Sequence, residues 1–385
     1  MGCITHRLYG SFLDNNLWRS ARHTAIFWQL VAVAVVAAGG IWLFGNILDN
    51  LANRGIASGF SFLKSTAGFG ISTSLIDFTE ASSIGRAFWV GLLNTLMVSA
   101  ISVVLATILG FAVGIARFSN NWLLARLAMG FVETLRNIPL LLQIFFWYFA
   151  VLRSLPGPRQ SYDIAGLAYL NNRGFYIPKL EFFDGSGWSV VWIVILAVAA
   201  FCLRRHRVVS RISVVLAVLI LIFLLVSASV SVPALKGFNF TGGSVLSPEF
   251  VALVIALSSY TAAFIAEIVR AGIQSVPRGQ IEAADALALS AKDRMRFVVI
   301  PQALRVIVPL LTNQYLNLTK NSSLAAAIAF PDLVSVFAGT ALNITGQAIE
   351  IIGITMAVYL TISLLIAFAM NAFNRATAMR GLSTG

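Results

Sequence analysis

Residues 88–116 read FWVGLLNTLMVSAISVVLATILGFAVGIA, a run of 29 residues without a charged side chain. A helix needs about 20 apolar residues to cross a hydrocarbon core of about 30 Å. Two further uncharged runs, at 212–232 and 351–374, are also long enough. Because lipid offers the backbone no hydrogen bonds, segments of this kind must be helical. The sequence therefore predicts an all-α polytopic membrane protein.

The composition of the chain supports this fold class. Of the 385 residues, 58% are hydrophobic and 11% are charged, whereas an average chain carries about 25% charged residues. Charged side chains are too few to keep an ordinary soluble domain in solution. The apolar runs predict about eight transmembrane helices, at 25–45, 88–116, 127–152, 188–203, 212–232, 249–269, 298–319 and 348–373.

The distribution of Lys and Arg orients these spans. With a cytoplasmic N-terminus, 16 basic residues fall in cytoplasmic segments and 9 in external ones. Basic residues favour the cytoplasmic side, so both termini are predicted to be cytoplasmic. The net charge of +12 is then mostly a consequence of topology, and it does not indicate a nucleic-acid partner.

The internal loop 270–297 is charged and helical in pattern, and residues 282–301, which run from it into the next span, read EAADALALSAKDRMRFVVIP. The first eight residues have high helix propensity, but a helix of about two turns is marginal alone and needs a partner surface. Its alanines would let it sit in a groove of that partner, and Ser290 can cap a second helix running through Arg294. From spacing alone, an ordinary interfacial helix between two spans is an equally good interpretation.

This loop resembles the EAA motif of ABC importer permeases. The residues that match are Glu282, Ala283, Ala284, Val298, Ile300 and Pro301. The motif glycine is replaced by Ala288, and if that position needs a left-handed backbone, alanine costs about 1–2 kcal/mol. The resemblance implies a coupling helix that docks onto an ATPase subunit and that includes Glu282, Ala283, Ala284 and Ala288.

Three further segments are similar to those of polar amino-acid permeases: RNIPLLLQ at 136–143, AEIVRAGIQSV at 266–276 and KNSSL at 320–324. The resemblance covers about residues 86–150 and 248–373, half the chain. One extra N-terminal span and a hairpin of spans inserted at 188–232 give an enlarged plan. That plan resembles the Q-type permease subunit of general L-amino-acid ABC transporters.

The resemblance implies a five-helix type I ABC importer (MetI-like) core in the bacterial inner (cytoplasmic) membrane. The permease domain would occupy 86–373, with inserted spans at about 153–247 and the coupling loop at 270–297. The remaining parts would be a cytoplasmic tail at 1–24, an extra span with a periplasmic loop at 25–85, and a second cytoplasmic tail at 374–385.

The same resemblance implies a transport subunit for L-amino acids, polar and of broad range, and not an enzyme. Its expected partners are an ABC ATPase dimer, a second permease of M type in a heterodimer, a periplasmic amino-acid-binding protein and membrane lipid. The sequence has no Gly-x-x-x-x-Gly-Lys-Ser/Thr phosphate loop. ATP and Mg²⁺ are therefore expected on the ATPase, with no cofactor and no metal in this chain.

The alternatives from another class are an intramembrane enzyme, for which the sequence shows no convincing catalytic pair, and an ion-coupled secondary amino-acid carrier that works alone. Such a carrier should show acids at the membrane midplane or broken helices in repeated halves. Neither feature is clear in the sequence. Association with a separate ATPase would distinguish the two functions, since a carrier does not require one.

Ionisable residues inside spans are costly, so they are candidates for substrate contact. Lys320 ends an otherwise uncharged stretch and is followed by Asn321, Ser322 and Ser323. One cation with several hydroxyl and amide groups suits a substrate carboxylate. A lysine that extends to the outer interface is the alternative, and the family resemblance favours substrate contact.

Two acid–base pairs and one glycine pattern have structural interpretations. Glu133 and Arg136 are three residues apart, as are Glu267 and Arg270. This spacing predicts intrahelical ion pairs, or side chains that extend to the inner membrane surface, and a role of Glu133 and Arg136 in a gate is a further alternative. A Gly-x-x-x-Gly pattern begins at Gly110 and predicts close packing between helices.

Overall fold

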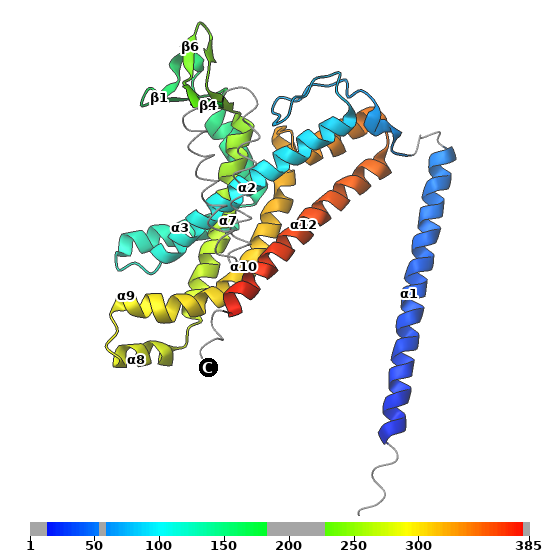
Figure 1. The fold of residues 1–385 in the computed structure, drawn as a ribbon, viewed down its shortest axis with the longest axis vertical. Coiled ribbons are helices and arrows are strands. Elements are labelled where there is room, and N and C mark those ends of the chain that lie inside the picture. The colour runs from blue at the N-terminus through cyan, green and yellow to red at the C-terminus, as the bar shows by residue number, and fades with distance from the viewer. Residues whose placement is uncertain (1–13, 54–58, 183–227, 380–385) are drawn as a thin grey trace, which may run out of the picture.

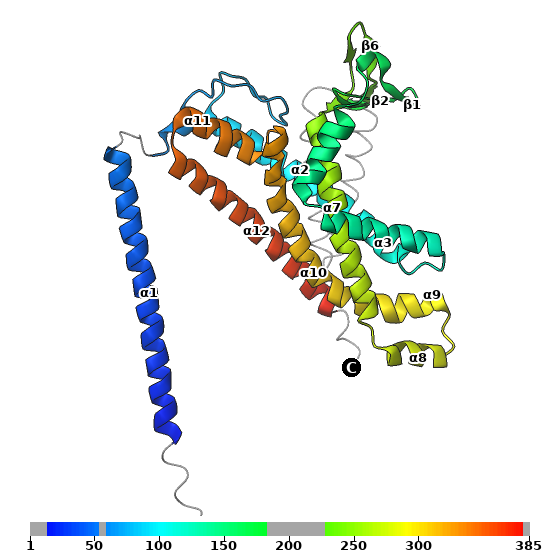
Figure 2. The same cartoon turned by 180° about the vertical axis from the view of Figure 1, so that it is seen from behind.

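A computed structural model describes residues 14–53, 59–182 and 228–379 of the chain. Long helices make up most of it (Figures 1 and 2). Five helical segments of the described ranges are long and apolar enough to cross a membrane. They are centred on α1 (Asp14–Asn53), α2 (Ile84–Ala116), α7 (Pro248–Gln274), α10 (Ile300–Asn321) and α12 (Ala348–Met379).

A sixth candidate span is broken in its middle. Helix α3 (Trp122–Asn137) meets the helical segment made of α4 (Leu140–Phe145) and η2 (Phe146–Leu152) at an angle of 107°. The break falls at Ile138, whose backbone is extended (φ −92°, ψ 127°). Because Pro139 follows, the helical conformation is disfavoured at Ile138, and the local sequence explains the bend.

The described helices confirm five of the predicted spans, and the third, at 127–152, corresponds to the bent pair, which makes a sixth if its two parts are counted as one span. The predicted spans at 188–203 and 212–232 lie outside the described residues, except for 228–232. There the prediction is wrong at its end, because Ala228–Ser231 form strand β5 and pair with Lys179–Phe182 of β4. Residues 228–231 therefore do not belong to a helical span.

Helix α7 lies at the centre of the bundle and packs against α2, α3 and α10. Helix α2 approaches it closely because two glycines face α7. A Cβ on Gly110 would lie 2.6 Å from Cβ of Ile265, and one on Gly114 would lie 2.8 Å from Cβ of Val269. Only glycine fits such contacts without displacing its neighbour, so the close packing predicted from the Gly-x-x-x-Gly pattern is confirmed.

Polar side chains define where several helices begin. Ser83 accepts a hydrogen bond from the N–H of Arg86 at the start of α2, and Asn121 accepts one from Leu123 at the start of α3. Ser247 does the same at the start of α7. Such caps satisfy backbone donors that have no partner within the helix.

The chain between α10 and α12 forms three short helical segments: η5 (Ser322–Ile328), η6 (Val334–Ala341) and α11 (Leu342–Thr345). Asp332 is buried and caps η6, since its carboxylate accepts hydrogen bonds from the N–H groups of Val334 and Ser335 at 3.2 and 2.9 Å. Asn94 of α2 donates to the carbonyl of Pro331 at 2.8 Å. These bonds satisfy irregular backbone inside the bundle, as a lipid environment requires.

A small β unit interrupts the helical fold. A four-stranded antiparallel sheet has the order β1 (Tyr162–Ile164), β2 (Ala168–Asn171), β3 (Gly174–Ile177) and β8 (Ser244–Leu246). Two-stranded pairs are formed by β4 with β5 and by β6 (Ala234–Lys236) with β7 (Asn239–Thr241), and the turn η3 (Pro158–Gln160) precedes β1. The sequence predicted loops and helices in this region, and these strands were not expected.

The two ends of the bundle differ in structure. The β unit lies at the end where α7 begins, and α8 (Arg278–Ala286) and α9 (Ala291–Arg294) lie at the opposite end (Figure 1). Residues 59–83, with η1 (Ser61–Lys64), form a loop that is joined to α12 by a 2.8 Å hydrogen bond from the N–H of Gly59 to Glu350. Helix α1 stands beside the bundle (Figures 1 and 2), and its apolar window has no buried residue.

Candidate functional site: the coupling segment and the polar face of α10

The predicted coupling residues lie in α8 and the turn that follows it. Helices α8 and α9 with the turn between them, residues 278–294, are called the coupling segment. Helix α8 packs on the bundle through Ala284, which is 3% exposed, and through Ile281, which contacts the apolar cluster of Val276 and Val299. The opposite face of the helix is exposed. It carries Glu282, Ala283, Asp285, Ala286 and Leu287. Small and apolar groups beside two carboxylates form a surface that a partner protein can cover.

The turn after α8 is a Schellman motif, a common way to end a helix. The N–H of Leu289 donates to the carbonyl of Ala284 at 3.2 Å, and the N–H of Ala288 donates to the backbone carbonyl of Asp285 at 2.9 Å. Ala288 holds the left-handed position with φ +53°. The position of the motif glycine therefore does require a left-handed backbone, and this chain meets the requirement with an alanine.

The second helix of the segment begins as the sequence predicted. The Ser290 hydroxyl accepts a hydrogen bond from the N–H of Asp293 at 3.1 Å and caps α9. Arg294 in α9 forms an ion pair with Asp285 in α8. The chain then continues through η4 (Met295–Val299) into α10. The cap and the ion pair link both helices of the coupling segment to one span.

The predicted substrate residues lie where α10 gives way to η5, but they do not share one direction. Lys320 is exposed, and Asn321 and Ser323 are partly exposed. The Ser323 hydroxyl donates to the carbonyl of Lys320 at 2.7 Å. Ser322 is 1% exposed and donates to the carbonyl of Thr319 at 2.7 Å. Ser322 thus faces the protein interior, and its hydroxyl is already engaged by backbone.

Two residues that the sequence analysis missed extend the face of Lys320. Asn313 and Asn317 are exposed, and spacings of four and three residues place them on the same side of α10 as Lys320. Leu311 and Leu318 on the other side are buried. Lys320 forms no ion pair with another described residue. The periodicity of Asn313, Asn317 and Lys320 was present in the sequence and could have indicated this polar stripe.

A cluster of charges joins three helices near the end that carries α8. Glu267 of α7 pairs with Arg117 at the end of α2 at 2.5 Å, with Arg136 of α3 at 3.9 Å, and with Arg270. The predicted pair of Glu267 and Arg270 is confirmed. The predicted pair of Glu133 and Arg136 is wrong, because the guanidinium of Arg136 turns to Glu267 across the helix interface and lies 5.2 Å from the ring centre of Phe264.

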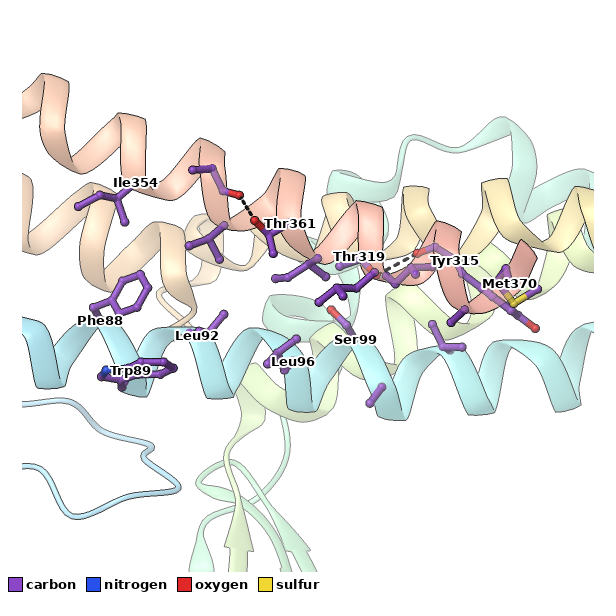
Figure 3. A pocket seen from close by; sticks show the side chains of 18 residues that line it. Phe88, Trp89, Leu92, Leu96, Ser99, Tyr315, Thr319, Ile354, Thr361 and Met370 are labelled. Atoms are coloured by element: carbon purple, nitrogen blue, oxygen red, sulfur yellow. Dashed lines mark hydrogen bonds between the residues drawn. The ribbon is translucent and has the colours of Figure 1, made fainter. Parts of the chain in front are cut away.

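An apolar cavity lies apart from the polar stripe. It has a volume of about 850 Å³ and lies between α2, α10 and α12, with Phe88, Leu92 and Ile354 among its lining residues (Figure 3). The Thr319 and Thr361 hydroxyls at its wall donate to backbone carbonyls one turn earlier, at 2.9 and 2.8 Å. The hydroxyl of Ser99, which also lines the cavity, has no hydrogen-bond partner among the described residues. A wall made mostly of hydrocarbon offers no charge to a charged solute.

The family described as "Binding-protein-dependent transport system inner membrane component" matches residues 193–380. The permease protein YhdX of Escherichia coli (strain K12) is 54% identical over 93% of this chain and 96% of its own length. The general L-amino acid transport system permease protein AapQ of Rhizobium johnstonii is 47% identical over 93% of each chain. This chain belongs to the amino-acid ABC transporter permease family.

The permease is a transport subunit and not an enzyme, and it is a multi-pass helical membrane protein. The alignments with YhdX and AapQ cover more of the chain than the sequence motifs, which covered about half of it. Because only 7% of the chain is left unaligned with YhdX or AapQ, most of 25–85 and 153–247 must be shared with these relatives. The ion-coupled alternative finds no support in these relatives. A solved structure described as an amino acid ABC transporter with histidines is similar at a TM-score of 0.48 and 22% identity, over 76% of the permease and 94% of that chain.

Proposed function

We propose that the permease moves L-amino acids, polar and of broad range, from the periplasm to the cytoplasm. The observation that carries this proposal is the 47% identity with AapQ, a general L-amino acid transport system permease, along almost the whole of both chains. A match of this length includes the spans, the coupling segment and the β unit together. The polar stripe on α10 supplies a cation and amides for an amino-acid substrate.

The proposed topology has eight spans in the bacterial inner membrane with both termini in the cytoplasm. Five candidate spans of the described residues, with the bent pair counted as a sixth, and the predicted spans at 188–203 and from 212 to before 228 support this number. The proposed parts are the tail at 1–24, the extra span and periplasmic loop at 25–85, the permease domain at 86–373 and the tail at 374–385. The β unit would then face the periplasm and α8 the cytoplasm.

The coupling segment is proposed to dock on an ATPase dimer that holds ATP and Mg²⁺. Glu282 and Ala283 would contact the ATPase directly because both are exposed. Ala284 would anchor α8 to the bundle, and Ala288 would set the angle between α8 and α9. A second permease of M type would supply the other coupling helix, and a periplasmic amino-acid-binding protein would deliver the substrate. Approach of the two ATPase subunits would then shift the spans between inward-facing and outward-facing states.

The substrate path is proposed to run along the polar stripe. Lys320 would bind the substrate carboxylate, with Asn321 and Ser323 beside it and Asn317 one turn further along α10. A charge-assisted hydrogen bond of this kind contributes about 1.5–3 kcal/mol. Ser322 would hold the backbone of this segment in place, since its hydroxyl is bonded to Thr319.

Co-purification and uptake together test the proposed function. The tagged permease is purified in mild detergent, its partners are identified by mass spectrometry, and uptake of labelled L-glutamine is measured in cells that express the whole system. We expect an ATPase, a second permease and ATP-dependent uptake. A permease that is recovered alone and moves solute in liposomes without ATP would contradict the proposal.

A further inference from the structure

A polar pocket of about 540 Å³ lies where the β unit meets the helical bundle, far from the coupling segment. Three ionisable side chains reach it from different elements: Arg153 after η2, Arg173 in the turn between β2 and β3, and Glu249 in the first turn of α7. The lining of this pocket includes two cationic side chains and one carboxylate, whereas the lining of the cavity between α2, α10 and α12 is mostly hydrocarbon. The polar pocket has the charge composition that a zwitterion requires.

Arg153 and Glu249 line this pocket without neutralising one another. They form no ion pair, and Arg153 is paired with no acid of the described residues. One oxygen of the Glu249 carboxylate accepts a hydrogen bond from the Tyr148 hydroxyl at 2.8 Å. The centre of the Arg153 guanidinium lies 5.9 Å from the centre of the same tyrosine ring. Tyr148 therefore holds both groups at one wall while each keeps binding capacity.

A third polar group in the pocket also lacks a partner. The side-chain oxygen of Asn172 is buried and accepts no hydrogen bond from the described residues. Its backbone N–H donates to the carbonyl of Pro156 at 3.0 Å, which fixes the residue in the turn before β3. Buried polar atoms are nearly always satisfied in folded proteins. Because the protein shields this oxygen from solvent, a ligand in the pocket does not reach it directly.

The wall of the pocket is continuous in sequence with the segment that follows the polar stripe of α10. Ala329, which forms part of its wall, directly follows η5. The segment η5 begins next to Asn321, so one short helix connects the pocket to the region of Lys320. A solute released at the β unit would meet this pocket before it reached the spans.

We propose that this pocket is a separate outer binding site for the α-amino and α-carboxylate groups of a free amino acid. The Arg153 guanidinium binds the carboxylate, a geometry that arginine favours. The Glu249 carboxylate accepts hydrogen bonds from the ammonium group. The side chain of the amino acid makes little difference here, because recognition uses only the groups common to all of them. The choice of ligand rests on the proposed function.

Binding to the purified full-length permease in detergent, without a binding protein, tests this site. The probe is L-glutamine, and it is compared with L-glutaminamide, which lacks the carboxylate, and with 4-carbamoylbutanoate, which lacks the ammonium group. We expect Arg153→Gln and Glu249→Gln each to weaken L-glutamine binding at least tenfold. Arg153→Gln should also abolish the preference over the amide, and Glu249→Gln the preference over 4-carbamoylbutanoate.

The matched control is Arg159→Gln in the β unit, whose guanidinium lies over Phe238 at 4.0 Å and does not line the pocket. It should bind as the unaltered chain does. The inference is overturned if the unaltered permease binds no L-glutamine, or if both pocket variants bind it with unchanged affinity and selectivity. In either case, uptake by cells with the whole system still tests the proposed function separately, since an importer without this outer site would continue to transport.

Discussion

At the residue scale, Ala288 holds a backbone conformation that alanine disfavours. Its φ of +53° places Cβ too close to the following carbonyl, at a cost of about 1–2 kcal/mol. We expect Ala288→Gly to stabilise the permease by about 0.5–1 kcal/mol, because glycine removes this strain but adds about 0.4–1 kcal/mol of entropy to the unfolded chain. Equilibrium unfolding in mixed detergent micelles measures the difference.

Ala286→Gly is the matched control for that change. Ala286 lies within α8, where glycine is less favourable than alanine by about 1 kcal/mol. The same chemical substitution two residues apart should therefore have opposite signs. If both variants lowered the free energy of unfolding, the left-handed conformation of Ala288 would not destabilise the permease as proposed.

Lys320 is the residue on which the proposed path most depends. Replacing it by glutamine keeps a polar side chain but removes the charge that would bind the substrate carboxylate. We expect Lys320→Gln to reduce uptake of L-glutamine about tenfold or more, since tenfold corresponds to about 1.4 kcal/mol. The control is Lys236→Gln on exposed strand β6, and uptake by both variants is measured at equal amounts of protein in the membrane.

Unchanged uptake by Lys320→Gln would assign Lys320 to the alternative role, a side chain that extends to the membrane interface. A change in the concentration dependence of uptake, with maximal rate preserved, would place the effect in substrate affinity. Both results differ from the effect expected of substitutions in the coupling segment, which should lower the maximal rate of uptake.

At the element scale, α8 presents an exposed face on a helix that has a single buried residue, Ala284. Reversing one charge on that face should disturb docking without disturbing the bundle. We expect Glu282→Lys to abolish uptake and to lose the ATPase during purification, while the permease still elutes as a single folded species. The matched control is Glu80→Lys in the exposed loop 59–83. Normal uptake by Glu282→Lys would remove the coupling assignment.

The contact of α2 with α7 depends on glycine in a different way from the turn at Ala288. A methyl group on Gly110 would overlap the Cβ of Ile265, so the two helices must separate or shift. We expect Gly110→Ala to lower the free energy of unfolding by about 1–3 kcal/mol, the usual effect of overpacking. Gly130→Ala in α3 is the control, since no atom lies within 4 Å of its new Cβ. Equal effects of both variants on unfolding would argue against close packing.

The elements differ in how far the sequence predicted them. Long helices are predictable because a span needs a continuous apolar run, and 88–116 has no competing interpretation. The Ser290 cap was predictable because capping is local. Arg136 was assigned the wrong partner because Glu267 lies 131 residues away in sequence, and sequence spacing reports only local neighbours. The β unit was missed because its strands are three or four residues long, and short strands give little periodicity.

At the scale of the whole molecule, the permease carries two different structures at its two ends. The β unit and the polar pocket with Arg153 and Glu249 lie at one end, and α8 with α9 lies at the other (Figure 1). Helix α10, which carries the polar stripe, follows both in sequence and runs from the end with α9 into the bundle (Figure 1). This arrangement gives a direction to transport, provided that the end with the β unit faces the periplasm.

Cysteine labelling of two lysine positions tests that orientation. Lys236 on strand β6 and Lys292 in α9 are both exposed, and each is replaced by cysteine in a chain whose Cys3 and Cys202 are changed to serine. Basic residues favour the cytoplasmic side, and 16 of them fall there in the predicted topology. We therefore expect a membrane-impermeant thiol reagent to label Lys236→Cys in spheroplasts and Lys292→Cys only after permeabilisation. The reverse pattern would place α8 outside, where no ATPase can reach it, and would overturn the topology and the coupling mechanism together.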